Sequence, residues 1–503
     1  MARSDGYGAS EGRFGRLFAL NDVELGNLKP HPSPIYDLLL LGGEGGAMDE
    51  GVTPGAPVGD SSIPAGVTFF GQFVDHDVTL DVSTRLDQPA IPEEIENFRT
   101  INLDLDCVYG AGPEASPYLY DLPKLVVGTE LAPGRNDLPR FNEVALIGDP
   151  RNDENAIVSQ LQAAFIAFHN AMVDKIIEDD PFLDPLTLTP QEKREVFEEA
   201  RDNVIHYYHR LLVEDFLPQV IGVNRTVNIA QNGRKYYFPE GFYDNDKARI
   251  KRPFMPIEFS VAAYRFGHSQ VRQTYTLNEN RQDVALFDPS GLMGFKPIEP
   301  VNVIDWRFFF PVDDGSGIDP QKARRIDTLL PNHLFRLDEV GVVSPGDEGS
   351  LAARNLNRGR VYRLPPGQEI AKWLGEVPIA ADLLTETTLA IPSTPLWYYI
   401  LQESSHIETS RTYNMSVEVA WGADNKSNPI ETKGEGSGFG DILGPVGGTI
   451  VGEVIAGLID HYRETTGKGL DYIPSVKLET IDTGKFGQRV QMQHMLEFAG
   501  QLP

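Results

Sequence analysis

The sequence predicts one large, mainly α-helical domain with long ordered loops and little β-structure. Hydrophobic residues make up 41% and charged residues 23% of the 503 residues, a globular balance that excludes a disordered or fibrous chain. Four segments carry apolar residues at helical spacing and a later helix is expected, whereas strand patterns are few and short. The 48 glycines and 37 prolines require long loops between those helices.

The N-terminal segment differs in composition from the rest of the chain. Gly, Pro and Ser are concentrated in residues 1–65, so we expect an irregular arm there and the body of the domain over residues 66–503. The first residues lack the apolar core of a signal peptide, and no apolar stretch of about 18 residues occurs. The sequence therefore predicts a cytoplasmic protein without a membrane span, with export by a signal-independent route as the alternative.

Negative charge limits the classes of partner. The formal net charge of −29 argues against nucleic acid or an anionic membrane surface as the main partner. It suits hard cations such as Ca²⁺, which prefer oxygen ligands. Cys107 is the one cysteine, so the chain has no internal disulfide and no cluster of thiolate metal ligands.

Helical periodicity places the main elements in chain order. Apolar residues recur at helical spacing over residues 69–80, 157–176, 196–217 and 257–275, and a later helix is expected over residues 450–462. Pro218 is expected to end the third helix, and the turn-forming GPVGG is expected to precede the last. Candidate functional residues lie on the first and fourth helices and in the loops.

His76 lies in line with the apolar residues of the first expected helix. Asp75 and Asp77 flank it, and Gln72 lies one turn earlier on the same face. Two carboxylates beside a half-buried histidine cost desolvation free energy unless a metal or a covalent partner pairs with them. The alternative is a core histidine that protein partners satisfy.

Two further segments carry candidate residues. His268 directly follows Gly267, which leaves room beside the imidazole for a flat cofactor, although tight helix packing would use a glycine equally well. In GDPRNDENAI, Arg151 and Glu154 stand just before the second helix. There Glu154 would complement the helix dipole, and an Asn or Asp near position 152 or 153 could serve as the N-cap.

Acidic residues alternate near residue 104. The alternating positions are Asn102, Asp104 and Asp106. Their spacing is that of the first half of an EF-hand, but the sixth and twelfth positions hold Cys107 and Pro113 rather than Gly and Glu. The segment is not an EF-hand. A Ca²⁺ site completed by a distant residue such as Asp77 and a solvated acidic turn are the two interpretations.

Six segments stand in a characteristic order. They are FGQFVDHDVT (70–79), the Asp-x-Asp-x-Val-Tyr-Gly loop (104–110), GDPRNDE (148–154), HN (169–170), FSVAAYRFGHSQVR (259–272) and RNLNRGR (354–360). In order and approximate spacing they resemble the catalytic domain of the animal-type haem peroxidase family, the peroxidase–cyclooxygenase superfamily, which has many bacterial members. The resemblance covers roughly residues 60–475 and implies a haem peroxidase catalytic domain within residues 66–503.

The resemblance implies roles for individual residues. His76 is expected to be the distal histidine, with Arg151 as the distal arginine and Gln72 beside them. His268 is expected to bind the haem iron, and Asn355 to hydrogen-bond its other ring nitrogen. The implied activity reduces hydrogen peroxide through an oxo-ferryl state. One imidazole acts as base and then acid, and a guanidinium stabilises the departing oxygen.

The resemblance also implies how haem b is held. Asp75 and Glu154 occupy the positions of carboxylates that form ester bonds to haem methyl groups in this family. Asn155 stands where myeloperoxidase has the methionine of a sulfonium bond, so a two-ester haem is implied, closer to lactoperoxidase. Arg265 and Arg358 match arginines near the haem propionates. Iodide, bromide, thiocyanate or phenols are then the implied electron donors rather than chloride.

The family's Ca²⁺ site joins the aspartate after the distal histidine to a loop. The matching ligands are Asp77, Thr100, the Asn102 carbonyl, Asp104 and Asp106. Asp106 stands where the family usually has Ser. Because Ca²⁺ prefers anionic oxygens, the extra carboxylate is compatible with binding.

Two alternatives retain a bound cofactor. Fatty-acid dioxygenases of the same superfamily carry a radical-forming tyrosine three residues before the proximal histidine. This chain has Arg265 there, and Tyr264 is one residue earlier, about 100° around a helix. An adhesion or matrix protein that binds haem or Ca²⁺ without turnover would not need His76 and Arg151.

A third alternative is a non-haem metal hydrolase. It would use Asp75, His76 and Asp77. The pair His206 and His209 lends it some support, but their i, i+3 spacing is more typical of a helix surface.

Overall fold

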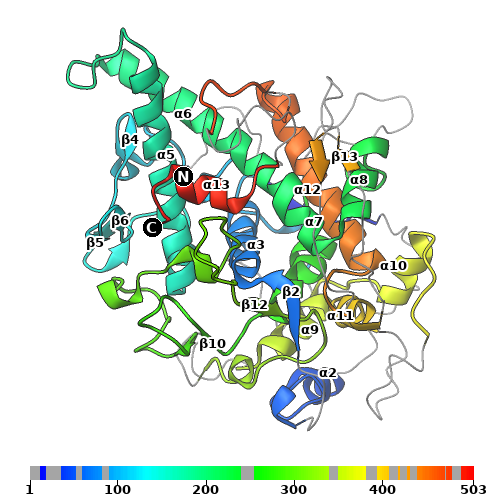
Figure 1. Ribbon diagram of the computed structural model, residues 1–503. Coiled ribbons are helices and arrows are strands. Elements are labelled where there is room, and N and C mark those ends of the chain that lie inside the picture. The colour runs from blue at the N-terminus through cyan, green and yellow to red at the C-terminus, as the bar shows by residue number, and fades with distance from the viewer. Residues whose placement is uncertain are drawn as a thin grey trace, which may run out of the picture.

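Helices form the body of the protein, and its strands are short (Figure 1). The computed structural model describes residues 12–18, 35–52, 59–81, 90–238, 254–338, 349–380, 394–406, 417–419, 428–430, 439–470, 472–478 and 489–502. The α-helices are α2 (Ile35–Gly42), α3 (Ala65–Val78), α4 (Asp106–Tyr109), α5 (Ala156–Asp179), α6 (Pro190–Leu211), α7 (Leu217–Val220), α8 (Val223–Asn232), α9 (Leu351–Val361), α10 (Gly367–Trp373), α11 (Leu396–His406), α12 (Pro445–Thr466) and α13 (Met492–Phe498). The predicted mainly α architecture is confirmed.

Short elements connect these helices. The strands are β1 (Arg13–Gly15), β2 (Asp60–Pro64), β3 (Tyr120–Asp121), β4 (Lys124–Leu125), β5 (Glu130–Ala132), β6 (Arg135–Asn136), β7 (Arg140–Phe141), β8 (Val144–Ala145), β9 (Phe254–Pro256), β10 (Thr274–Tyr275), β11 (Val284–Ala285), β12 (Lys322–Arg324), β13 (Val417–Val419) and β14 (Asn428–Ile430). The 3-10 turns include η4 (Pro150–Asp153) and η7 (Ala263–His268), and η5 (Leu212–Phe216) and η6 (Glu258–Ala262) are π-helical turns.

Strands fasten distant segments together rather than building a layer. Within the described ranges every sheet has two strands. β1 pairs in parallel with β9, which brings an N-terminal segment beside the chain that leads to His268. β2 pairs antiparallel with β12 directly before α3 begins. Both pairings therefore tie N-terminal residues to the elements that carry the candidate residues.

Aromatic packing fixes α3 at the centre of the helical core, with α5 beside it (Figure 1). Phe70 and Phe73 stack on Phe165 of α5, with ring centroids 6.4 and 4.5 Å apart. Tyr208 of α6 meets the same rings edge-on. Burying each such ring contributes about 1.5–3 kcal/mol. α3 and α5 confirm the first two helices expected from periodicity.

The helix expected over residues 257–275 is wrong in form. A π-helical turn, η6, is followed by the 3-10 turn η7, and the last two residues of the segment form β10. A side chain from α11 takes a backbone group that a continuous helix would use, because Trp397 Nε1 donates to the Arg265 carbonyl oxygen at 3.1 Å. Tertiary contacts override the helical pattern here.

Three predicted helix boundaries also differ. α6 begins earlier than expected, after a capping box made by Thr189 and Glu192. Pro218 does not end this helix, because the π-helical turn η5 interrupts it and Pro218 lies in the first turn of α7. α12 begins at Pro445, inside GPVGG. Proline is tolerated in a first turn, where its missing N–H has no helical acceptor.

α5 is the one helix in the described part of the chain that is long and apolar enough to cross a membrane. In its most apolar window, 78% is buried inside the protein. Phe165 and Phe168 are among its fully buried side chains. Such burial is typical of a core helix.

Candidate functional site

One face of α3 carries polar side chains. Gln72 and Asp75 are half-buried there, and His76 is buried with 5% exposed. His76 Nδ1 lies 2.7 Å from Asn152 Oδ1. Burial, with the positive charge of Arg151, lowers the pKa of His76 to about 4. The imidazole is therefore neutral at pH 7 and able to accept a proton.

The loop before α5 brings Arg151 and Glu154 to this face. Asp149 caps η4 by accepting a hydrogen bond from the Arg151 backbone N–H at 2.8 Å. Asn155 is the N-cap of α5, because its side-chain oxygen accepts from two backbone N–H groups of the first turn. The N-cap is therefore an Asn close to the expected positions, but not position 152 or 153 itself, because both lie within η4.

Arg151 is held between its own loop and the C-terminal end of α3. Its Nη2 donates to Asp149 Oδ2 at 2.8 Å, to the His76 carbonyl at 3.3 Å and to the Thr79 carbonyl. Its Nη1 lies 4.0 Å from Asp75 Oδ2. Burial alone would raise the pKa of Asp149, but hydrogen bonds and positive charge from Arg151 lower it below its usual value. Asp149 and the two backbone carbonyls thus hold the Arg151 guanidinium beside His76.

Glu154 joins the loop to α3 through Gln72. Gln72 Nε2 donates to Glu154 Oε1, and Asn155 Nδ2 donates to Gln72 Oε1 at 3.2 Å. Burial raises the pKa of Glu154 to about 7. A substantial fraction of this carboxyl is therefore protonated near neutral pH.

His268 ends η7, which packs against α3. A Cβ added to Gly267 would meet no atom within 4 Å, so open space rather than tight helix packing lies at this glycine, next to His268. Asn355 of α9 approaches His268 Nδ1, with its Nδ2 at 2.7 Å. Burial, with the positive charge of Arg265, lowers the pKa of His268 to about 3. The ring is neutral and offers a lone pair to a metal ion.

The orientation of the Asn355 amide decides which ring nitrogen of His268 offers that lone pair. With Nδ2 toward the ring, the amide donates and the ring carries its proton on Nε2. A half-turn places Oδ1 there, so that Nδ1–H donates and Nε2 keeps its lone pair. Both orientations occupy the same volume, and a metal ion at Nε2 would select the second.

Arg265 adds positive charge beside this histidine, and Arg358 adds positive charge beside Arg265. Arg265 Nε is buried and has no hydrogen-bond partner among the described residues. Burial and the positive charge of Arg358 lower the pKa of Arg265 to about 10, and charges on Asp75 and Arg151 also act on it. Arg358 Nη1 lies 3.5 Å from Asp81 Oδ2. A buried guanidinium with an unsatisfied N–H suits a ligand that carries carboxylates.

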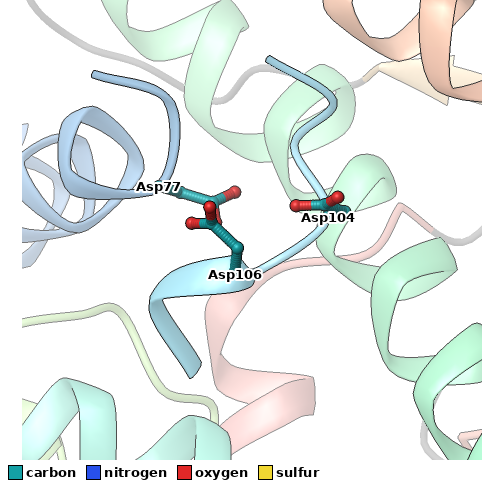
Figure 2. Close-up of side chains that lie close together, drawn as sticks. All are labelled: Asp77, Asp104 and Asp106. Carbon is teal, nitrogen blue, oxygen red and sulfur yellow. The ribbon is translucent and has the colours of Figure 1, made fainter. Parts of the chain in front are cut away.

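Three carboxylates converge beside α3 (Figure 2). One oxygen each of Asp77, Asp104 and Asp106 lies within 4.8 Å of the others, and no other such group occurs in the described ranges. Asn102 is buried in the same segment. Burial raises the pKa of all three carboxyls, that of Asp106 to about 7. A divalent cation would remove this repulsion between neighbouring charges.

Thr100 and the backbone shape the loop of residues 100–106, which carries Asp104 and Asp106 and is called the carboxylate loop below. The Thr100 backbone N–H donates to Asp106 Oδ2 at 3.0 Å, and its hydroxyl donates to Asp104 Oδ1 at 2.5 Å. Leu103 and Leu105 have φ angles of 51° and 59°. These left-handed residues turn the chain sharply on both sides of Asp104.

His206 and His209 are not on a helix surface, so that interpretation is wrong. Both are buried in α6, where the rings of Tyr472 and Tyr462 cover them at 5.8 and 5.0 Å. Neither joins a group of metal-ligating atoms within the described ranges. The same holds for His76, so the placement gives the hydrolase alternative no metal centre.

Tyr264 lies beside α3. Its hydroxyl lies 4.0 Å from the point where a Cβ on Gly71 would be. This hydroxyl has no hydrogen-bond partner in the part of the chain described. Arg265 stands three residues before His268. In the 3-10 turn η7, neighbouring side chains diverge by about 120°, so Tyr264 points away from the direction of Arg265.

Several polar residues at the site were missed by the sequence interpretation. They are Asp81, Arg99, Asp149, Asn152 as a partner of His76, and Gln162. Asp149 and Asn152 stand in the segment that also holds Arg151, which was the one local signal. Asp81 lies far along the chain from Arg358, and Arg99 and Gln162 each also contact a residue about fifty positions away, so local spacing did not indicate them.

The model of the family described as animal haem peroxidase matches residues 81–375, more than half of the chain. The matched range contains Arg151, Glu154, His268 and Asn355. It begins after α3, so His76 and its neighbours lie just outside it.

Curated relatives show the same likeness. The chain is 24% identical over 274 residues to peroxinectin A from Dictyostelium discoideum, a match that covers 51% of this chain and 42% of that protein. It is 26% identical over 253 residues to lactoperoxidase from Mus musculus, covering 46% and 31%. The chain therefore spans less than half the length of either relative.

Solved structures share the fold over nearly the whole chain. Peroxidase A from Dictyostelium discoideum superimposes with a TM-score of 0.54 at 15% identity, covering 95% of this chain and 94% of that chain. Fatty acid alpha-dioxygenase from Oryza sativa superimposes with a TM-score of 0.56 at 17% identity, covering 98% and 79%. At these identities the likeness shows the fold.

Proposed function

Because the chain belongs to the animal haem peroxidase family, we propose that it binds haem b and uses it to reduce hydrogen peroxide. One observation carries the proposal. A neutral base, His76 of α3, lies beside the guanidinium of Arg151 from the loop before α5. A neutral metal ligand, His268 of η7, contacts Asn355 of α9 and lies beside open space at Gly267. A haem that reduces peroxide needs a nitrogen ligand for its iron and a nearby group that transfers the proton of the peroxide.

The residues present fit the cofactor. His268 would bind the iron through Nε2, with Asn355 accepting from Nδ1–H, which makes the imidazole a more basic ligand. Arg265 and Arg358 would pair with the propionates, which would supply the acceptor that Arg265 Nε lacks within the described residues. When bound, the haem supplies the redox chemistry toward peroxide.

The chain's own residues move the protons. His76 Nε2 would take a proton from the incoming hydrogen peroxide and return it to the oxygen that departs as water. Arg151, fixed by Asp149, would stabilise the negative charge that develops on the departing oxygen. Gln72 lies one turn before His76 and keeps Glu154 against the same face.

Small reductants are the proposed electron donors, namely iodide, bromide, thiocyanate and phenols. Asn155 supports this choice, because it occupies the position of the sulfonium methionine and makes no thioether available. Fatty-acid dioxygenation is the alternative. Two observations favour the peroxidase. Arg265 occupies the position of the radical-forming tyrosine, and Tyr264 lies against Gly71.

An absorption spectrum tests the proposed function directly. The full chain, expressed with added haem, is expected to show a Soret band that shifts when hydrogen peroxide is added. Turnover of iodide and guaiacol is then compared with oxygen uptake on a fatty acid. A protein without a Soret band refutes haem binding, and oxygen uptake without peroxide turnover refutes the peroxidase in favour of the dioxygenase.

Loss of two carboxyls is expected to make the haem extractable. We propose that Asp75 and Glu154 form esters with haem methyl groups. Each carboxylate gains a C–O bond to a methyl carbon that loses one hydrogen, while one peroxide accepts two electrons and becomes water. After peroxide treatment, acidified acetone should leave the haem on the wild-type protein and remove it from the double variant Asp75→Val/Glu154→Gln.

Single variants test each of the two ester bonds separately. Asp75→Val and Glu154→Gln alone should each retain haem through the remaining ester, which mass spectrometry of haem-bearing peptides would locate. Free haem in the peroxide-treated wild type would refute the esters and leave the peroxidase proposal intact.

Calcium is expected to stabilise the fold through the three-carboxylate group. At a Ca²⁺ concentration about a hundredfold above Kd, binding adds about 2.7 kcal/mol to the free energy of unfolding. Asp104→Asn should lose the rise in Tm that Ca²⁺ gives the wild type. In EDTA the same variant should melt no lower than the wild type, because it removes repulsion among Asp77, Asp104 and Asp106.

Asp174→Asn is a matched control for charge. Asp174 is an exposed aspartate that pairs with Lys124 on the surface, away from the carboxylate group. Its Ca²⁺ response should equal that of the wild type. Equal Ca²⁺ responses in Asp104→Asn and the wild type would contradict a calcium site here.

A further inference from the structure

We propose that Asn152 and Gln162 set the tautomer of His76, so that its Nε2 is the nitrogen free to accept a proton. They act as positioning residues. The proposal rests on the proposed peroxidase function for its consequence, but the tautomer itself is a property of the chain. Neither residue was singled out for this role by the sequence.

A chain of side-chain amides runs behind His76 and ends on the backbone. His76 Nδ1 lies 2.7 Å from Asn152 Oδ1. Asn152 Nδ2 donates to Gln162 Oε1 at 2.8 Å, and Gln162 Nε2 donates to the Cys107 carbonyl at 3.1 Å. Asn152 and Gln162 have no exposed surface, and His76 is 5% exposed. Every link is therefore shielded from competing water.

The direction of this chain follows from its last acceptor. A backbone carbonyl only accepts, so Gln162 must present its NH₂ group to Cys107 and its oxygen to Asn152. Asn152 must then present its NH₂ to Gln162 and its oxygen to His76. An amide oxygen also only accepts, so His76 Nδ1 must carry the proton. Reversing any amide would bring two acceptors together in a buried place.

This direction decides the chemistry available at the other ring nitrogen. With the proton on Nδ1, Nε2 of the neutral ring keeps its lone pair. In the other tautomer Nε2 would carry a proton and could not accept one from peroxide. The amide chain thus presents His76 as a base before any substrate arrives, and its far end rests on α4 beside the carboxylate loop.

Nitrogen-15 NMR of the histidines reads the tautomer without any enzymatic turnover. The full chain, which has 10 histidines, is labelled with ¹⁵N-histidine and measured alone and with diamagnetic zinc protoporphyrin. His76→Gln identifies the signals of His76. Two-bond ¹H–¹⁵N correlations then show which ring nitrogen is protonated, and Nδ1–H is expected in the wild type.

Variants separate the amide chain from ordinary packing. Asn152→Leu removes the acceptor and should abolish the single Nδ1–H tautomer. Asn152→Asp keeps an acceptor and should retain Nδ1–H. Gln162→Met frees the Asn152 amide to turn and should give a mixture of tautomers. Gln160→Met is the matched control, because Gln160 is also a buried, hydrogen-bonded glutamine of α5 but bonds to backbone groups away from His76.

Kinetics of the haem-loaded protein give the consequence. Asn152→Leu should slow the reaction with peroxide by about 10- to 100-fold, as for loss of a second-sphere partner, and Asn152→Asp should restore most of the rate. The proposal is overturned if His76 of the wild type carries its proton on Nε2. It is also overturned if His76 keeps its proton on Nδ1 in both Asn152→Leu and Gln162→Met. A wild type that ignores peroxide refutes the peroxidase function, while the NMR result still decides the tautomer.

Discussion

Replacing His268 with alanine is expected to abolish normal haem ligation. In the proposed site, His268 would supply the nitrogen that binds the iron, and among the described residues no atom lies within 4 Å of where a Cβ of Gly267 would be. Haem titration followed by absorption spectroscopy should show no Soret band of the wild-type form. An unchanged spectrum in His268→Ala would refute the assignment of the iron ligand.

Two further variants sharpen this result. Asn355→Ala should weaken haem affinity by about 10- to 100-fold, because it removes the partner that orients the ring and raises its basicity. His333→Ala is the control. His333 is half-buried, its ring nitrogens have no hydrogen-bond partner in the described part of the chain, and burial lowers its pKa to about 4. Its loss should leave the haem spectrum unchanged.

Replacing His76 with glutamine should leave haem bound but slow the reaction with peroxide by about 10²–10⁴-fold, the usual contribution of acid–base catalysis. Glutamine fills a similar volume but cannot exchange a proton near neutral pH. Stopped-flow measurement of the Soret shift at several peroxide concentrations gives the second-order rate constant directly.

His169→Gln is the matched control for this substitution. His169 is also a buried histidine with a pKa lowered to about 4 by burial, but its ring bonds Tyr109 and the Pro123 carbonyl. The control should react with peroxide like the wild type. If His76→Gln did so too, His76 would not be the base.

Much of the fold was predictable because the strongest periodic segments also pack most tightly. The helices around Phe73 and Phe165 follow their apolar stripes, and these stripes meet each other in the core. The segment that ends at His268 has the same periodicity but forms π and 3-10 turns. The Arg265 carbonyl in this segment accepts a hydrogen bond from Trp397, which is more than a hundred residues away. No local sequence pattern contains that contact.

The candidate site shows the same division. The family resemblance carried by the ordered segments indicated which residues belong together, whereas the chemistry of each segment alone left alternatives open. Boundaries failed where a turn competes with a helix, as at Asn155, which caps α5 after η4 has formed. The histidine pair of α6 was misplaced at the surface, because spacing shows which residues share a face and does not show what covers that face.

The sequence by itself determined the kinds of residue available and their order: a mainly helical chain, a surplus of acids and two histidines in apolar surroundings. Tertiary structure alone decided their states. Burial keeps His76 and His268 neutral, three aspartates converge, and an amide chain anchored on the Cys107 carbonyl orients His76. Protonation and hydrogen-bond direction depend on desolvation and on partners far along the chain, and only the folded arrangement of the helices supplies both.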